Sequence, residues 1–234
     1  MDQLYLWLNL GSLSIPFLFS FHPKIQFYKH WPTVFPGILV MMLTFIPWDI
    51  YFTAQGFWGF NPDYLIGYNV AGLPVEEWLF FICIPYACLF THYTIVQLKP
   101  QWSFSAKNAQ RLFLILAALL IISLWYGYHN WYTAVSFSFA LVVLGLTNNY
   151  KTQLFQSFFV SYAIILIPFF IVNGILTGSG LPEAVVWYND AENFGLRLGT
   201  IPVEDTVYNL GMLLTVVLVS DYLGSRQKSD TRDV

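Results

Sequence analysis

The chain has 234 residues, of which 57% are hydrophobic, 20% are aromatic and only 10% are charged. A soluble domain carries about a quarter of charged residues. With a mean hydropathy of +0.58, this composition excludes an ordinary soluble enzyme and predicts an integral membrane protein. The net charge is −3 and there is no basic run, which excludes a nucleic-acid-binding surface.

Seven apolar stretches approach the roughly 20 residues that a helix needs to cross a bilayer. The first is preceded by no basic segment, so it predicts a membrane helix and not a signal peptide. From Gly224 the chain turns polar, which is typical of a disordered tail. The helices are predicted near 3–21, 33–53, 74–97, 110–127, 131–148, 153–175 and 202–223.

The Lys and Arg residues predict the orientation of these helices, because short cytoplasmic loops are enriched in them. With seven helices, Arg197 is alone on one side of the membrane. The distribution predicts a multi-pass protein of a bacterial plasma membrane, with its N-terminus outside and its C-terminus in the cytoplasm. The residues on the cytoplasmic side would be Lys24, Lys29, Lys99, Lys107, Arg111, Lys151, Arg226, Lys228 and Arg232.

Two segments of the chain repeat each other. Phe60-Asn61 aligns with Tyr188-Asn189, Gly67 with Gly195, and Pro74-Val75-Glu76-Glu77 with Pro202-Val203-Glu204-Asp205, all without a gap. We therefore expect an all-α fold of two three-helix repeats. Because corresponding helices are four spans apart, both repeats insert the same way up and are parallel. The expected parts are residues 1–100 (first repeat), 101–128 (linker and fourth helix), 129–223 (second repeat) and 224–234 (polar cytoplasmic tail).

Each repeat places two adjacent acids at the start of a helix. Proline is favourable at the first helical position, so Glu76 and Glu204 are predicted at the third position and Glu77 and Asp205 at the fourth. Acids in a first turn can simply stabilise the helix start. Adjacent residues project about 100° apart on a helix, so we expect one acid of each pair to support the helix and the other to face a cavity.

The position of these acid pairs favours a functional role. They lie at the edge of the hydrocarbon region, where carboxylates are costly and tend to be functional. Asp49 lies on the same side, and Arg197 is the only cation in the outer loops. The four histidines are scattered, and Cys83 and Cys88 are five residues apart on one helix, so the sequence predicts neither a metal site nor a disulfide.

Aromatic residues cluster around the acids along the chain. Trp and Tyr gather at membrane interfaces in any membrane protein, which accounts for many of them. Their π faces would also stabilise a carbocation. Acids and aromatic walls, without a Gly-x-Gly-x-x-Gly motif, predict proton-initiated chemistry on a hydrocarbon. The aromatic residues are Trp48, Trp58, Phe60, Trp78, Phe80, Phe81, Trp187, Tyr188 and Tyr208.

These motifs resemble those of the membrane-bound, flavin-independent lycopene cyclase family. In some bacteria of that family the two halves are separate polypeptides, and here they would be fused, as in the similar archaeal and fungal domains. The resemblance covers nearly the whole chain. It rests on Pro47-Trp48-Asp49, Trp58-Gly59-Phe60-Asn61-Pro62, Pro74-Val75-Glu76-Glu77 with Phe80-Phe81, Trp187-Tyr188-Asn189 and Gly199-Thr200-Ile201-Pro202-Val203-Glu204-Asp205.

The resemblance implies cyclisation of the ψ ends of lycopene to β rings, through γ-carotene to β-carotene, with no cofactor and no net redox change. Lycopene and other carotenoids would be the substrates, membrane lipid would surround the protein, and a homo-oligomer is compatible with this reading. Two pairs of corresponding positions carry different residues in the two repeats, Asp49/Asn173 and Asn69/Arg197. This asymmetry favours one competent cavity over two active sites. The implied acid and base candidates are Glu76, Glu77, Glu204, Asp205 and Asp49. The implied substrate-binding residues are Trp48, Trp58, Asn61, Phe80, Phe81, Trp187, Tyr188, Asn189 and Arg197.

Other functions stay open. A carotenoid hydratase, or a cyclase of longer carotenoids, would protonate the same double bond. A proton-coupled transporter with parallel repeats could also carry such acids, although they lie at helix starts and only Pro85 and Pro168 interrupt a span. A retinal-binding photoreceptor needs a lysine in its last helix, and the predicted span 202–223 contains none.

Overall fold

The protein is described here by a computed structural model over residues 3–230, with side chains over residues 3–227. Seven α-helices account for most of it, which confirms the predicted helical fold. They are α1 (Leu4–Phe19), α2 (Trp31–Ala54), α3 (Val75–Leu98), α4 (Ala106–Gly127), α5 (Trp131–Lys151), α6 (Leu154–Leu176) and α7 (Val203–Asp230).

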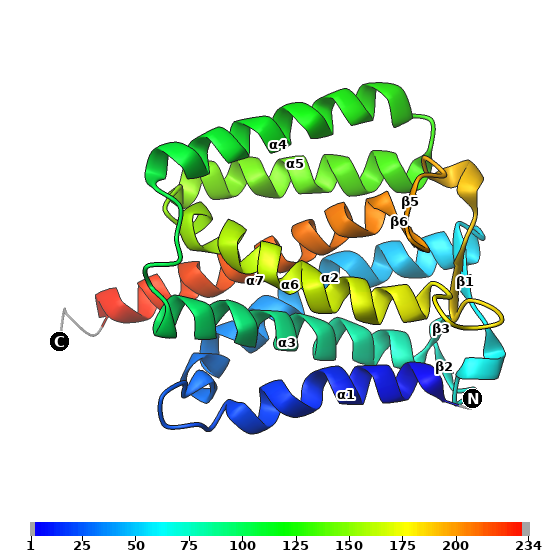
Figure 1. The fold of residues 1–234 in the computed structure, drawn as a ribbon, viewed down its shortest axis with the longest axis horizontal. Coiled ribbons are helices and arrows are strands. Elements are labelled where there is room, and N and C mark those ends of the chain that lie inside the picture. The colour runs from blue at the N-terminus through cyan, green and yellow to red at the C-terminus, as the bar shows by residue number, and fades with distance from the viewer. Residues whose placement is uncertain (1–2, 231–234) are drawn as a thin grey trace.

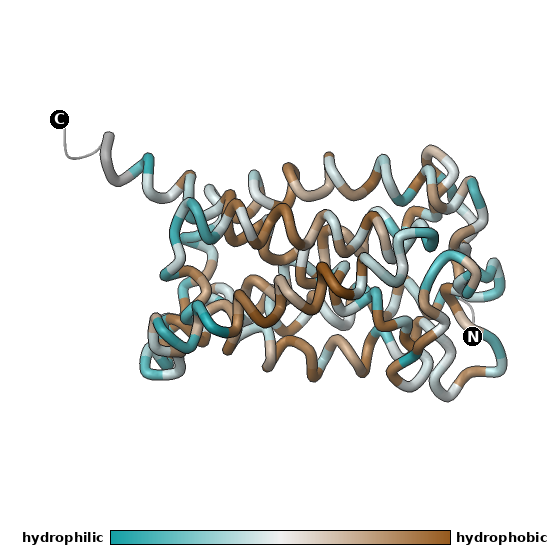
Figure 2. Tube along the Cα trace, turned by 90° about the horizontal axis from the view of Figure 1, so that it is seen from above, coloured by the Kyte–Doolittle hydropathy of each residue, from teal (hydrophilic) through white to brown (hydrophobic). Residues whose placement is uncertain are grey.

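The helices form one bundle of membrane-spanning length. Six of them are long and apolar enough to cross a membrane, whereas α1 is apolar but has only 16 residues. Hydrophobic residues follow the middle of the bundle and hydrophilic residues gather at its ends (Figure 2). In α4, only 11% of the most apolar window is buried. Such an exposed apolar helix belongs in lipid, and the chain is a multi-pass membrane protein.

The last helix is longer than predicted. Residues 224–230, expected to be part of a disordered tail, continue α7 to Asp230. The Arg226 guanidinium lies 4.8 Å from the centre of the Tyr222 ring, one turn earlier, and the segment contains good helix formers. Residues 231–234, and with them Arg232 of the predicted charge pattern, lie outside the described residues, as does the side chain of Lys228.

The connections before α3 and α7 contain short strands that the sequence did not predict. Every element of the second connection begins 128 positions after its counterpart in the first, as Val186 does after Trp58. The first contains β1 (Trp58–Phe60), the 3-10 helix η2 (Pro62–Tyr64), β2 (Asn69–Val70) and β3 (Leu73–Pro74). The second contains β4 (Val186–Tyr188), η3 (Asp190–Glu192), β5 (Arg197–Leu198) and β6 (Ile201–Pro202).

The strands β1 and β4 join the two repeats. They pair antiparallel, with Trp58 opposite Tyr188, Gly59 opposite Trp187 and Phe60 opposite Val186. Gly59 and Trp187 are counterparts in the repeat, so a pseudo-two-fold axis passes between them. A Cβ on Gly59 would lie 2.4 Å from the Trp187 ring, so only glycine allows this close pairing. The predicted duplication into two parallel repeats is confirmed.

The helices pack in the same symmetric way. Within the repeats, α1 packs on α3 as α5 packs on α7, while across them α2 packs on α7 and α6 packs on α3. The middle helix of each repeat therefore packs against the third helix of the other repeat. The strands and the N-terminus lie at one end of the bundle and the C-terminus lies at the other (Figure 1). The extra helix α4 packs on α5 and α6.

Candidate functional site

The helices α3 and α7 start alike, one residue later than predicted. Pro74 and Pro202 end the strands β3 and β6, and Val75 and Val203 are the first helical residues. Pro74 has an extended backbone (ψ 146) and is the N-cap of α3. The acids are therefore at the second and third helical positions, where exposed backbone N–H groups and the helix dipole favour negative charge.

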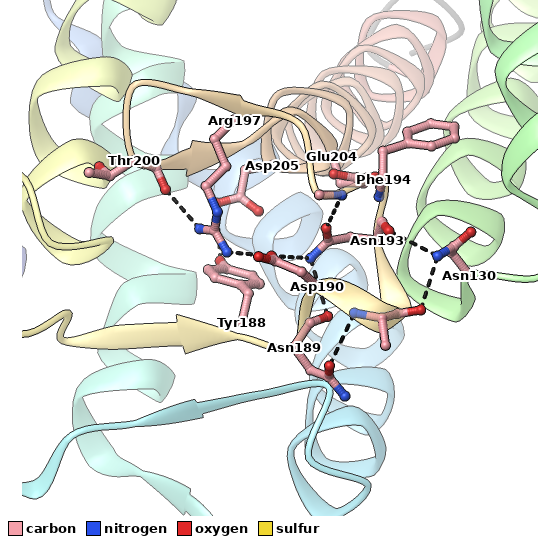
Figure 3. Close-up of polar contacts among 12 residues, drawn as sticks. Asn130, Tyr188, Asn189, Asp190, Asn193, Phe194, Arg197, Thr200, Glu204 and Asp205 are labelled. Carbon is pink, nitrogen blue, oxygen red and sulfur yellow. Dashed lines mark hydrogen bonds and ion pairs between the residues drawn. The ribbon is translucent and has the colours of Figure 1, made fainter.

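The first acid of each pair holds the preceding loop. Glu76 accepts a 2.6 Å hydrogen bond from the backbone N–H of Ile66, and Glu204 accepts a 2.8 Å bond from that of Phe194. The Thr133 hydroxyl also donates to Glu204, at 2.6 Å. Both acids are fully buried, and neither lines the cavity described below. Figure 3 shows Glu204 beside Phe194 in this arrangement.

The second acid of each pair lines a cavity at the strand-bearing end of the bundle. Glu77 of α3, Asp205 of α7 and Asp49 of α2 all border this cavity, whose volume is about 60 Å³. The sequence predicted that one acid of each pair would face inward, and the structure has this arrangement. Three of the five candidate acids are thus brought together at one site.

Asp205 lies among hydrogen-bond donors. The Tyr132 hydroxyl donates to Oδ1 at 2.6 Å, and the Asn173 amide and the Tyr188 hydroxyl donate to Oδ2 at 2.7 Å and 3.0 Å. Burial, and then the neighbouring Asp205, raise the pKa of Tyr188 well above its usual value, so this hydroxyl keeps its proton and donates. Three donors stabilise a carboxylate at Asp205.

In the other repeat, two acids lie beside each other. Glu77 accepts a 2.5 Å hydrogen bond from the Tyr5 hydroxyl, and Asp49 Oδ1 accepts a 2.6 Å bond from the indole N–H of Trp58. The two carboxyl groups border the same cavity, close enough for the charge of each to act on the other. Oδ2 of Asp49 is buried, and no hydrogen-bond donor reaches it from the described residues. Asp49 takes the place that Asn173 has beside Asp205, so the two repeats differ in chemistry here.

Apart from Asn209, the rest of the cavity wall is aromatic or apolar. Its rings pack closely: the centroids of Trp58 and Tyr132 are 5.0 Å apart, and Tyr132 stacks on Tyr188 at 5.9 Å. Phe60, Phe80 and other side chains complete the wall, and its residues, all within the described part of the chain, include no Lys, Arg or His. The acids therefore face aromatic faces without a cation to pair with them.

Several predicted substrate-binding residues lie elsewhere in the structure, and three of them form polar contacts within the two connections. Asn61 and Asn189 cap the 3-10 helices, accepting hydrogen bonds from the backbone N–H groups of Asp63 and Ala191. Arg197 forms an ion pair with Asp190 at 2.5 Å, and its guanidinium lies over the Tyr188 ring (Figure 3).

Three more candidates pack behind or beside the cavity. Trp48 lies against Tyr208, with ring centroids 5.0 Å apart. Phe81 is fully buried in the core, and Trp187 is 46% exposed. Trp58, Phe80 and Tyr188 are the predicted substrate-binding residues that do line the cavity.

The sequence analysis missed the groups that hydrogen-bond to the acids. Tyr5 and Tyr132 begin corresponding helices, α1 and α5, and each donates to the inward acid of its own repeat. Alignment of the first helices of the two repeats would have found this pair. Asn173, considered only as the counterpart of Asp49, and Asn209 also line the cavity.

Cys83 and Cys88 are free thiols, and neither borders the acid cavity. Within residues 3–227, no three His, Cys, Asp or Glu side chains are grouped so that they could hold a metal ion.

Comparison with known proteins identifies the family. The chain matches the family model described as lycopene cyclase over residues 2–95 and 129–223, which are the two three-helix repeats. It is 39% identical over 49 residues to a bifunctional lycopene cyclase/phytoene synthase of Podospora anserina, a match that covers 21% of this chain and 8% of that protein. A protein of the same description from Aspergillus niger is 32% identical over 59 residues, which are 23% of this chain and 10% of the relative. No solved structure matches. The chain is a multi-pass membrane protein, and both of its repeats match this family model. It therefore belongs to the lycopene cyclase family.

Proposed function

We propose that this protein converts the ψ end groups of lycopene into β rings, through γ-carotene to β-carotene, without net redox change. The observation that carries this proposal is the cavity in which Asp49, Glu77 and Asp205 meet between aromatic walls. The two sides of this cavity differ. On one side Asp49 lies beside Glu77, and on the other Asp205 accepts hydrogen bonds from three donors. Proton-initiated cyclisation needs both a proton donor and a proton acceptor.

Asp49 and Glu77 form the proton-donating side. Two carboxylates next to each other repel when both are ionised, and the cavity wall contains no cation to offset this repulsion. The pair therefore holds a proton. Among the described residues, no donor is directed at Oδ2 of Asp49, whereas Glu77 accepts a hydrogen bond from the Tyr5 hydroxyl. We assign the donated proton to Asp49, with Glu77 as the partner that keeps it neutral.

The reaction then proceeds by three bond changes. A proton leaves Asp49 and adds to the CH carbon of the terminal double bond, which leaves a tertiary cation on the dimethyl carbon. The π electrons of the double bond at the start of the conjugated chain attack this carbon, close the six-membered ring and move the cation to the methyl-bearing ring carbon. Loss of a proton from the ring carbon that joins the chain restores a double bond.

Asp205 is the acceptor of that last proton. Its three hydrogen-bond donors hold it as a carboxylate in a fixed orientation. The rings of Trp58, Tyr132 and Tyr188 stabilise the cation through their π faces. The substrate gains one proton and loses one, so the reaction is an isomerisation, and the enzyme resets when Asp205 passes its proton back towards Asp49.

The orientation proposed from the Lys and Arg residues fits the bundle. The connections between α1 and α2, α3 and α4, and α5 and α6 lie at the end opposite the strands (Figure 1). These connections carry or adjoin most of the basic residues. The acid cavity would then lie at the outer face of a bacterial plasma membrane, with the N-terminus on the same side.

Expression in bacteria that accumulate lycopene, followed by chromatography of the extracted pigments, tests the function. We expect lycopene to be consumed and β-carotene to form, with γ-carotene as the intermediate. Hydroxylated acyclic products would identify a hydratase instead. Unchanged lycopene, with the protein present and folded in the membrane, would exclude carotenoid cyclisation.

A further inference from the structure

A groove of about 210 Å³ leads away from the acid cavity along the bundle. Its floor is the face of α3 from Phe80 to Thr91, and its walls are α1 and α6. Phe80, Phe169 and Asn173 border both the groove and the acid cavity, so the two spaces adjoin each other. At 1.5 Å per residue, the floor is about 16 Å long.

The chemistry of the groove suits a hydrocarbon. Its lining carries no charged side chain, and its few polar groups include Thr91, whose hydroxyl is already bonded to the Ala87 carbonyl oxygen at 2.9 Å. An apolar groove that adjoins a group of acids suits a hydrocarbon chain with a reactive end group. Binding sites that bury apolar ligands have this composition, with few polar groups at the point of chemistry.

The groove is open on the side that faces lipid. Pro168 of α6 is exposed, and Ser12 of α1 and Cys88 of α3 are half-buried. These residues lie within the spans of their helices, and α1 is at one edge of the bundle (Figure 1). A molecule dissolved in the bilayer can therefore reach the groove sideways, between α1 and α6.

The corresponding place in the other repeat is filled. The counterparts of Ala87 and Cys88 are Thr215 and Val216, which are buried where α2 packs on α7. A Cβ on Gly37 of α2 would lie only 3.0 Å from the Val216 carbonyl oxygen. The close approach of α2 to α7 thus occupies the equivalent position. Of the two symmetric positions, the one beside α3 has space for a hydrocarbon chain.

From these observations we infer that the groove between α1, α3 and α6 binds the conjugated chain of the carotenoid, so that one end group at a time reaches the acid cavity. The inference rests on the proposed function. The rest of the substrate extends past Thr91 or out between α1 and α6 into lipid. The second ring then requires that the one-ring carotenoid leaves the groove and binds again in the opposite direction.

A graded obstruction of the groove tests this inference. Ala87→Leu, Ala87→Phe and Ala87→Trp place increasing volume on its floor, and the same three changes at Ala163, an exposed residue of α6 outside the groove, are the matched controls. The measurement is the initial rate of lycopene consumption in isolated membranes, divided by the amount of folded protein. We expect the rate to fall stepwise with side-chain volume, at least tenfold for Ala87→Trp, and to stay within twofold of wild type in the Ala163 series.

The outcomes separate the two proposals. If wild type cyclises lycopene and Ala87→Trp is as fast per folded molecule, the groove does not hold the chain. The same conclusion follows if the Ala163 series loses activity in parallel. If Ala87→Trp does not fold, Ala87→Leu and Ala87→Phe decide by the same criterion. A wild-type protein that leaves lycopene unchanged would overturn the proposed function itself.

Discussion

Asp49 and Asn173 take corresponding places in the two repeats, yet their effects on the ionisation of the neighbouring acid are opposite. The Asn173 amide can only donate from its nitrogen, and it does so to Asp205 at 2.7 Å. A carboxyl group at Asp49 offers Glu77 no such fixed donor and adds a second negative charge when ionised. In the proposed mechanism, this single difference between amide and acid lets one side of the cavity hold a proton and the other a carboxylate.

The first prediction concerns the two inward acids. Asp205→Asn removes the proposed base, and Glu77→Gln removes the negative charge that keeps Asp49 protonated. Each should lower the rate of ring formation by about a hundredfold or more, because general acid–base groups contribute on this scale. Pigment analysis of membranes with equal amounts of folded protein measures the effect. Asp63→Asn, at an exposed acid of η2, is the control and should behave as wild type. Normal β-carotene formation by both inward variants would remove these residues from the mechanism.

The second prediction concerns Tyr188, the donor that lies outside the spans. Replacing it by Phe removes one of three hydrogen bonds to Asp205, and bonds to charged groups contribute about 1.5–3 kcal/mol. Activity should fall by about tenfold to a hundredfold, less than in Asp205→Asn. An unchanged rate would show that the hydroxyl does not support the carboxylate.

The upward shift of the Tyr188 pKa also predicts how stability depends on pH. The folded protein keeps this proton above about pH 10, where the unfolded chain has lost it. Above that pH the folded state binds more protons, so the free energy of unfolding falls as pH rises. The Tyr188→Phe variant should lose less stability than wild type in this alkaline range, and denaturation curves at increasing pH would measure the difference. Below about pH 10 the two proteins should respond to pH alike.

At the scale of the elements, the start of each acid-bearing helix joins structure to chemistry. The first acid of each pair accepts a hydrogen bond from a backbone N–H group of the preceding loop, and the next residue then projects about 100° away, into the cavity. The short hairpins β2–β3 and β5–β6 carry the chain to this start in both repeats. Loop, strand and helix thus fix the direction of one inward carboxyl group in each half.

The third prediction separates the two acids of a pair. Glu204→Ala leaves the Phe194 N–H and the Thr133 hydroxyl without their buried acceptor, which should cost about 2–4 kcal/mol of folding stability. Thermal unfolding in detergent should show a lower Tm than for Asp63→Ala. Activity per folded molecule should remain far above that of Asp205→Asn. An equally complete loss of activity in folded Glu204→Ala would give this acid a direct part in the chemistry.

At the scale of the whole molecule, neither repeat can build the cavity alone. Glu77 and Asp49 come from the first repeat, whereas Asp205 and Asn173 come from the second. The exchange of middle helices and the β1–β4 pair hold these residues together across the pseudo-two-fold axis. The two similar halves therefore form one asymmetric site.

The fourth prediction follows from this exchange. Cutting the chain in the connection between α3 and α4, to give residues 1–102 and 103–234, separates the repeats without interrupting a helix. Co-expressed halves should assemble in the membrane and form cyclised carotenoid, because α2 packs on α7 and α6 packs on α3. Each half expressed alone should form none. Ring formation by a single half would show that the cavity does not require both repeats.

Much of this architecture can be predicted from the sequence alone. Seven apolar stretches, the repeat and the paired acids are local or recurring features, since the length of an apolar run and a repeated motif do not depend on distant contacts. The resemblance to the lycopene cyclases rests on the same motifs, and the family match covers both repeats. The ends of α7 and the short strands were missed because they depend on contacts beyond the apolar pattern.

Only the tertiary structure decided which side chains meet. Glu76 and Glu77 are adjacent in sequence and of the same residue type, and the approach of the Ile66 N–H to one and the Tyr5 hydroxyl to the other gives them different surroundings. Arg197 looked available to the acids but is held by Asp190. The groove exists because α6 packs on α3 less closely than α2 packs on α7, a difference of helix separation that no local motif encodes.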